Sequence, residues 1–127
     1  MPAWQKLLLL ALAGGIGALA RYGLAGVVQK YAGAAFPWGT LVVNLAGCFV
    51  FGVIWALAVE RMGMSAEVRT ILLVGFLGSL TPFSTFVSES YQLLAEAQWL
   101  PALGNLVGMN VSGLLVFGVG LAVGRIV

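Results

Sequence analysis

A short polar stretch, GSLTPFSTF at residues 78–86, interrupts an apolar segment of the sequence. Its serine and threonine hydroxyls can donate hydrogen bonds to a small anion, and the positive edge of an aromatic ring attracts an anion as well. Pro82 has no N–H and disfavours helical geometry at Thr81, so the carbonyl of Gly78 loses its helical partner. In hydrocarbon this carbonyl needs another partner, which can be a donor from the protein, a water molecule or a bound cation. The stretch therefore has groups that suit either kind of ion.

Two phenylalanines of this stretch lie in register with an acidic residue that follows it. Phe83, Phe86 and Glu89 are three residues apart and share one stripe of a helix, with Ser84 and Thr85 beside it. Ring edges and hydroxyls on such a stripe can line a path for a small anion. The alternative is that the phenylalanines face lipid or pack, which is their commoner role in membrane helices.

Further polar side chains occur inside the other apolar segments. Asn44 lies ~9 Å along a segment that begins at residue 38, and Asn110 with Ser112 lies ~15 Å along one that begins at residue 100. Each asparagine is either a hydrogen-bonding link between helices or part of a hydrated track, and their recurrence favours the track. Arg21 and Glu89 fall ~26 Å along their segments, near an interface. We interpret Arg21 as an anchor or a source of positive potential near an anion entrance.

The elements that must position these residues are membrane helices. The 127-residue chain is 61% hydrophobic and only 8% charged, which is typical of an integral membrane protein. Four apolar segments each reach the ~20 residues that cross a bilayer. We predict an all-α protein with one transmembrane domain over residues 1–127, in contact with membrane lipid. The predicted helices cover about 4–28, 38–59, 68–97 with a mid-membrane break near 78–82, and 100–125.

The residue inventory argues against catalysis. The chain has no histidine and one cysteine, and neither a carboxylate pair at metal-binding spacing nor a phosphate-binding loop between strand and helix is present in the sequence. We therefore expect no enzyme. No basic cluster with interleaved aromatic residues occurs, so nucleic acid is not expected as a partner. Small residues at four-residue spacing predict close helix packing instead; the pairs are Gly14 with Ala18, Gly104 with Gly108, and Gly120 with Gly124.

Three motifs resemble the Fluc, or CrcB-type, family of fluoride channels. They are GGIGALARY at residues 14–22, GTLVVNLAGCFVFG at residues 39–52, and GFLGSLTPFSTF followed by Glu89. The resemblance implies an antiparallel, dual-topology homodimer in the bacterial inner membrane. Such a dimer passively exports fluoride through two pores formed at the interface of its subunits. It also implies a structural sodium ion at the dimer centre, held by the backbone carbonyls of Gly78 and Thr81.

The same resemblance assigns roles along the ion pathway. It implies that Phe83 and Phe86 line the fluoride path, that Asn44 lies near it, and that Ser84 and Thr85 belong to its polar track. Glu89 matches an acidic residue that follows the phenylalanines, whereas Asn110 and Ser112 are assigned by depth alone. The family usually has threonine or serine where this chain has Pro82, so one hydroxyl is missing at the break.

The charge distribution leaves the partner and two other functions open. Lys6, Arg61, Arg69 and Arg125 fall at one set of helix ends and Lys30 at the other, which by itself predicts cytoplasmic termini. A dual-topology chain is expected to have little such bias, so a heterodimer with an oppositely oriented chain is the alternative to a homodimer. Other functions are a dual-topology, proton-coupled drug exporter, which needs a membrane carboxylate that the first helix lacks, and a non-conducting membrane assembly subunit.

Overall fold

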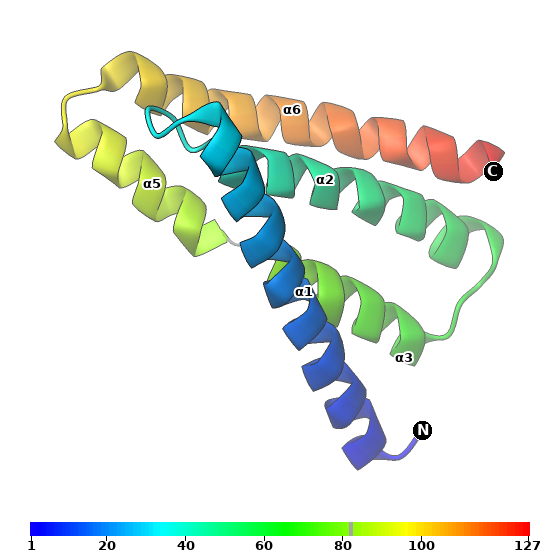
Figure 1. Ribbon diagram of the computed structural model, residues 1–127. Helices are drawn as coiled ribbons and strands as arrows, with labels where there is room; N and C mark the ends of the chain where they lie inside the picture. The colour runs from blue at the N-terminus through cyan, green and yellow to red at the C-terminus, as the bar shows by residue number, and fades with distance from the viewer. Residues whose placement is uncertain (82) are drawn as a thin grey trace.

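The computed structural model describes residues 1–81 and 83–127, and all regular elements in this part of the chain are helical. Pro82, to which the sequence assigns the break, lies outside the described residues. The elements, which Figure 1 shows, are α1 (Ala3–Ala32), α2 (Trp38–Trp55), η1 (Ala56–Arg61), α3 (Ala66–Arg69), η2 (Thr70–Leu77), α4 (Gly78–Leu80), α5 (Phe83–Ala95) and α6 (Trp99–Ile126). The η elements are π-helical, a wider form that the hydrophobic pattern did not predict.

Four helical segments are long and apolar enough to cross a membrane: Ala3–Ala32, Trp38–Arg61, Ala66–Ala95 and Trp99–Ile126. The all-helical, multi-pass architecture predicted from the sequence is therefore confirmed.

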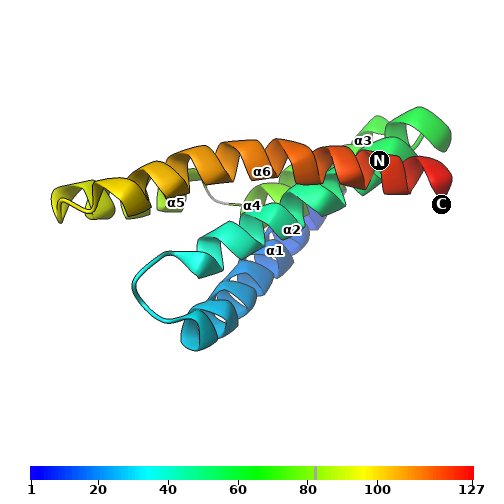
Figure 2. The same ribbon diagram turned by 90° about the horizontal axis from the view of Figure 1, so that it is seen from above.

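Both chain termini lie at the same end of the molecule as the connection between η1 and α3 (Figure 2). The amino group of Met1 is 3.6 Å from the Glu67 carboxylate. The Arg125 guanidinium binds both oxygens of Glu60, at 2.7 and 2.8 Å. These contacts bring the start of α1, the connection between η1 and α3, and the end of α6 together. The four basic residues that the sequence places at one set of helix ends therefore lie at this end of the molecule; they are Lys6, Arg61, Arg69 and Arg125.

The helix α6 packs closely along α2 and η1 at this end. A Cβ on Gly120 would collide with the Phe49 carbonyl, and one on Gly124 would lie 2.7 Å from the Ala56 Cβ. The close packing predicted for this pair is therefore confirmed. The prediction is wrong for Gly104 and Gly108 within the single chain, because a Cβ at either position would meet no described atom within 4 Å.

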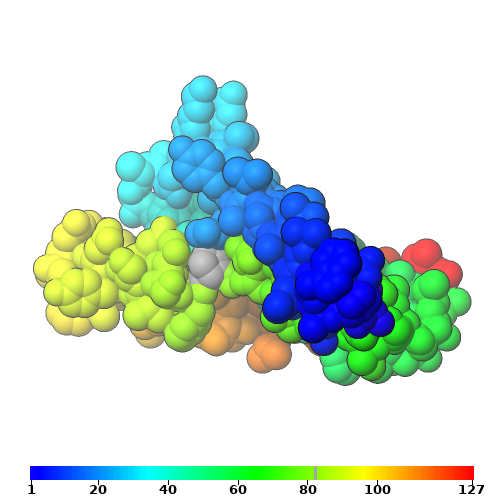
Figure 3. Space-filling view, turned by 90° about the horizontal axis from the view of Figure 1, so that it is seen from below, coloured from blue at the N-terminus to red at the C-terminus, as the bar shows by residue number. Residues whose placement is uncertain are grey.

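The helix α1 crosses the other helices and is mostly exposed. It packs against η2, α4 and α2, and Gly17 is its one fully buried residue among those described. Figure 3 shows α1 across one face of the molecule, with α5 on one side and the η1–α3 region on the other. The core that the other elements share is small and centres on Val43, Leu77 and Leu80. Much apolar surface is therefore left for lipid or for another subunit.

Candidate functional site

The third membrane segment is interrupted at Thr81, inside the region where the sequence predicts a break. Thr81 has φ −111° and ψ 90°, far from helical values. Its N–H and its hydroxyl both donate to the Leu77 carbonyl, at 3.1 and 2.8 Å. The non-helical ψ turns the Thr81 carbonyl away from the helical direction. The carbonyl of Gly78 would accept from the N–H of residue 82 in a continuous helix, but residue 82 is a proline and has no N–H. Two carbonyl oxygens of the break therefore differ from those of a continuous helix.

The helix α2 approaches this break at a glycine. A Cβ built on Gly47 would overlap the methyl group of Thr81, so any side chain at this position would push the two elements apart. Gly47, which belongs to the second motif, thus has a packing role at the break. It brings the helix that carries Asn44 close to Thr81.

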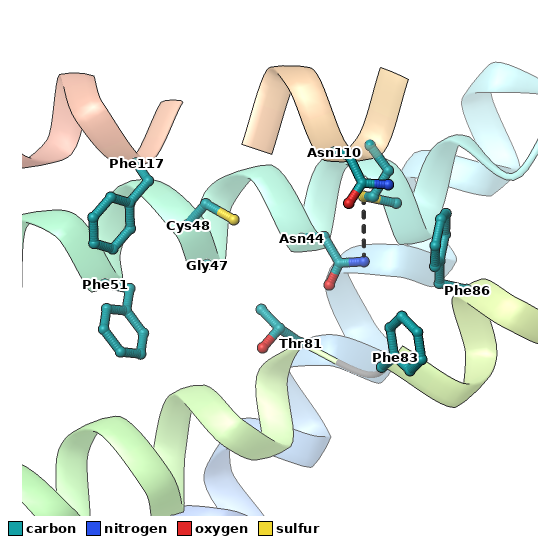
Figure 4. Close-up of a pocket in the computed structure, with 10 residues that line it drawn as sticks. Asn44, Gly47, Cys48, Phe51, Thr81, Phe83, Phe86, Asn110 and Phe117 are labelled. Atoms are coloured by element: carbon teal, nitrogen blue, oxygen red, sulfur yellow. Dashed lines mark hydrogen bonds between the residues drawn. The ribbon is translucent and has the colours of Figure 1, made fainter. Parts of the chain in front are cut away.

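An open cavity of about 310 Å³ lies beside the break, between α2, α5 and α6. Five of the residues predicted for the ion pathway and the break line it together: Asn44, Thr81, Phe83, Phe86 and Asn110. Figure 4 shows that these side chains come from different helices and surround one space. The other lining residues are Gly47, Cys48, Phe51, Met109 and Phe117.

The two phenylalanines of the predicted stripe have different environments. Their ring centroids are 6.0 Å apart and their planes meet at 47°. Phe86 is 6% exposed and is packed inside the protein, whereas Phe83 is 74% exposed in the single chain. The ring of Phe83 is therefore free to contact an ion, lipid or a second subunit, and that of Phe86 also packs.

The polar groups of α2 and α6 at this cavity are held in different ways. The side-chain nitrogen of Asn44 donates to the Met109 sulfur at 3.5 Å. Asn110 instead donates to the Leu106 carbonyl of its own helix at 2.7 Å. Ser112 also bonds back to its own helix, at the Gly108 carbonyl, and does not line this cavity or the others that contain predicted residues.

A second cavity, of about 300 Å³, contains the predicted charged residues. Arg21, Thr85 and Glu89 line it together with Gln29 and Thr40. The Arg21 Nε and one Glu89 carboxylate oxygen are buried and have no hydrogen-bond partner among the described residues. From the sequence, Arg21 and Glu89 were predicted to be separate charges near an interface, whereas the structure places them around one polar space. Gly78 and Ser84 line neither cavity, and Ser84 is exposed.

Three residues near these cavities were not selected from the sequence. Met109 was missed because a methionine in an apolar helix carries no polar signal. Gln29 donates to the carbonyls of Gly33 and Phe36 and accepts from the Gly39 N–H, so it ties α1 to the start of α2.

Asn105, the third missed residue, carried a signal that could have been used, because it is an amide inside an apolar segment. It is 1% exposed and donates to the Ser90 hydroxyl at 3.0 Å. The Ser90 hydroxyl in turn donates to the Phe86 carbonyl at 2.9 Å. The buried chain of bonds links α6 to the turn that carries Phe86.

Side-chain metal ligands are scarce in this protein. Residues 1–81 and 83–127 contain no group of three or more histidine, cysteine, aspartate or glutamate side chains arranged to hold a metal. A cation bound near the break would therefore have to use backbone carbonyls, hydroxyls or water. Backbone carbonyl oxygens are hard ligands that suit an alkali ion.

Comparisons with known proteins agree with the sequence motifs. The family model described as CrcB-like protein, Camphor Resistance (CrcB), matches residues 8–121. A protein of Nitrosococcus oceani named fluoride-specific ion channel FluC is 51% identical over 124 residues, which cover 98% of this chain and 99% of that protein. Proteins with the same name from Solidesulfovibrio magneticus and Nitratidesulfovibrio vulgaris are 47% and 46% identical, each over 97% of this chain and 98% and 99% of their own length. The chain therefore belongs to the CrcB family, as its three motifs predict.

Proposed function

We propose that this protein is a fluoride channel that exports fluoride passively. The observation that carries the proposal is the meeting of Asn44, Phe83 and Phe86 at one cavity, in a chain whose relatives are named fluoride-specific ion channels. Fluoride is small and strongly hydrated, so a conducting site must replace water with donors and still release the ion. An amide N–H and aromatic edges provide donors that carry no fixed positive charge. A narrow path of this kind would also exclude the larger chloride ion.

We further propose that two chains form an antiparallel, dual-topology homodimer with two pores. The support is that the cavity of the single chain is open and that Phe83, a predicted pore residue, is 74% exposed. A second chain packed there would close the cavity and supply its missing wall. A heterodimer with an oppositely oriented relative is the alternative partner, and the bacterial inner membrane is the location we propose.

A sodium ion at the dimer centre fits the residues of the break. The Gly78 carbonyl has no donor at residue 82 because that residue is proline, and the non-helical ψ of Thr81 turns its carbonyl away from the helix. Two antiparallel chains would bring four such oxygens together on a two-fold axis. The bound ion would neutralise these dipoles and supply a positive charge near the anion pathway.

Fluoride efflux from liposomes tests the channel function. Purified protein is reconstituted in vesicles loaded with potassium fluoride or potassium chloride, without a proton gradient and with valinomycin to carry potassium. We expect fluoride efflux and no chloride efflux. Transport of a lipophilic organic cation that requires a proton gradient, without fluoride efflux, would favour the exporter, for which Glu89 at the second cavity is the candidate carboxylate. The absence of any transport in these assays would favour the non-conducting assembly subunit.

A further inference from the structure

The first cavity contains an unusual acceptor for an amide. The Asn44 side-chain nitrogen lies 3.5 Å from the Met109 sulfur, and both residues line the cavity. The dashed line in Figure 4 marks this bond, with the Asn44 amide nitrogen toward the space near Phe86. The two residues are 65 positions apart in sequence, so the contact links α2 to α6.

A thioether sulfur is a weak hydrogen-bond acceptor, whereas a carbonyl oxygen is a strong one. The two asparagines at this cavity therefore differ in how firmly their N–H groups are held. Asn110 is bound to a backbone carbonyl at 2.7 Å. Asn44 is bound to sulfur, so its N–H is oriented but is easily transferred to a stronger acceptor such as an anion.

We propose that Met109 is a positioning residue that sets how readily Asn44 gives its N–H to the permeating anion. The inference rests on the proposed channel function and adds a determinant of its rate. The sulfur holds the amide in a defined orientation inside an apolar wall, where an N–H without any acceptor would be costly. When fluoride arrives, the amide exchanges the weak bond to sulfur for a strong bond to the anion, and it returns to sulfur after the ion leaves.

Two substitutions of similar volume separate this role from packing. Met109→Leu keeps an apolar side chain and removes the acceptor, so the Asn44 amide loses its fixed orientation without meeting a competing acceptor, and fluoride flux per assembled dimer should fall by about twofold. Met109→Gln adds a strong carbonyl acceptor that competes with fluoride for the Asn44 N–H. Flux should then fall about fivefold or more, the factor that corresponds to the net contribution of a typical hydrogen bond.

Met62→Gln is the matched control, because Met62 is 68% exposed at the end of η1, away from the cavity. Its flux should equal that of the unmodified protein. Equal losses in Met109→Leu and Met109→Gln would mean that the residue acts by packing alone. Unchanged flux in Met109→Gln, with dimer assembly intact, would also overturn the inference.

A second measurement does not depend on conduction. The side-chain ¹⁵N–¹H resonances of Asn44, assigned by their loss in Asn44→Ser, should move between the unmodified protein, Met109→Leu and Met109→Gln, because the acceptor differs. Added fluoride should shift them less in Met109→Gln than in the other two. If the unmodified protein fails to conduct, the channel proposal falls while this experiment still decides the Met109 contact. Identical resonances in all three proteins would reject the contact itself.

Discussion

The two phenylalanines of the third segment are chemically alike but occupy different environments. Phe86 is nearly buried and Phe83 is largely exposed in the single chain. A substitution at Phe86 therefore changes packing and any ion contact together. Phe83 allows the contribution of the ring edge to be measured more cleanly.

We expect Phe83→Ile to lower fluoride flux per assembled dimer by about two- to tenfold, because isoleucine is apolar but has no positive ring edge. Liposome efflux normalised to dimer content measures this. The control is Tyr91→Ile, on the same helix, since Tyr91 is 68% exposed and lines neither cavity. Normal flux and chloride exclusion in Phe83→Ile would remove the ring from the ion pathway. Poor assembly with normal flux in the remaining dimers would assign it to packing.

Gly47 is the second residue at which a change of a single methyl group has a predictable effect. A Cβ there would overlap the Thr81 methyl group, so Gly47→Ala should force α2 away from the break. We expect a loss of roughly 1–3 kcal/mol in the free energy of unfolding, typical of overpacking, together with reduced fluoride flux. Gly15→Ala is the control, because its Cβ would meet no described atom of the chain within 4 Å. Thermal unfolding in detergent and liposome efflux measure the two effects, and equal behaviour of both variants would contradict the close approach.

At the scale of elements, α5 depends on α6 for its position. The bond from Asn105 to Ser90 is the one side-chain hydrogen bond that the described chain places between these two helices. Asn105 is also an incomplete partner, because its side-chain oxygen is buried without a described donor. Such a group costs stability, so its presence is better explained by positioning the turn of Phe86 than by stabilising the fold.

Asn105→Leu and Asn105→Ala test this interpretation. Leucine fills the space and removes both polar groups, so the free energy of unfolding should change little or rise. Alanine leaves a cavity and should cost roughly 1–3 kcal/mol. Both variants lose the bond to Ser90, and we expect fluoride flux per dimer to fall in both. Ser90→Ala should reproduce this loss. A fully conducting Asn105→Leu protein would show that the bond does not position the ion pathway.

At the scale of the whole molecule, the exposed faces of α1 and α6 are too apolar for water and must contact lipid or protein. The basic residues at the end that holds both termini favour one orientation, whereas the proposed dimer needs both. The single cysteine makes a direct test simple. In a Cys48→Ala background, Ala3→Cys places a reactive thiol at the exposed start of α1.

We expect a membrane-impermeant maleimide applied to intact cells to label about half of the Ala3→Cys copies, and the rest only after permeabilisation, because dual topology places termini on both sides. A second cysteine variant, Val127→Cys, should give the same fraction, since both termini lie at one end of the molecule. Labelling from one side alone would contradict dual topology. A heterodimer would then be the way to obtain an antiparallel pair.

The sequence by itself determined the four membrane helices and the place of the break. Hydropathy over ~20 residues is a local property, and a proline acts on its own turn, so neither needs knowledge of distant contacts. The predicted segment at residues 38–59 corresponds to Trp38–Arg61, and the break predicted near 78–82 includes the non-helical Thr81. The wide turns η1 and η2 were not predicted, because π-helical bonding leaves no periodic signal in so short a segment.

Only the tertiary structure decided which polar residues meet. One helical stripe contains Phe83, Phe86 and Glu89, yet the rings line the first cavity and the carboxylate lines the second. The spacing of residues along one helix cannot distinguish these outcomes, because a cavity is formed by the angles at which several helices cross. The partnership of Asn44 with Met109 has the same origin: the residues are 65 positions apart, and the approach of α2 to α6 alone brings them together.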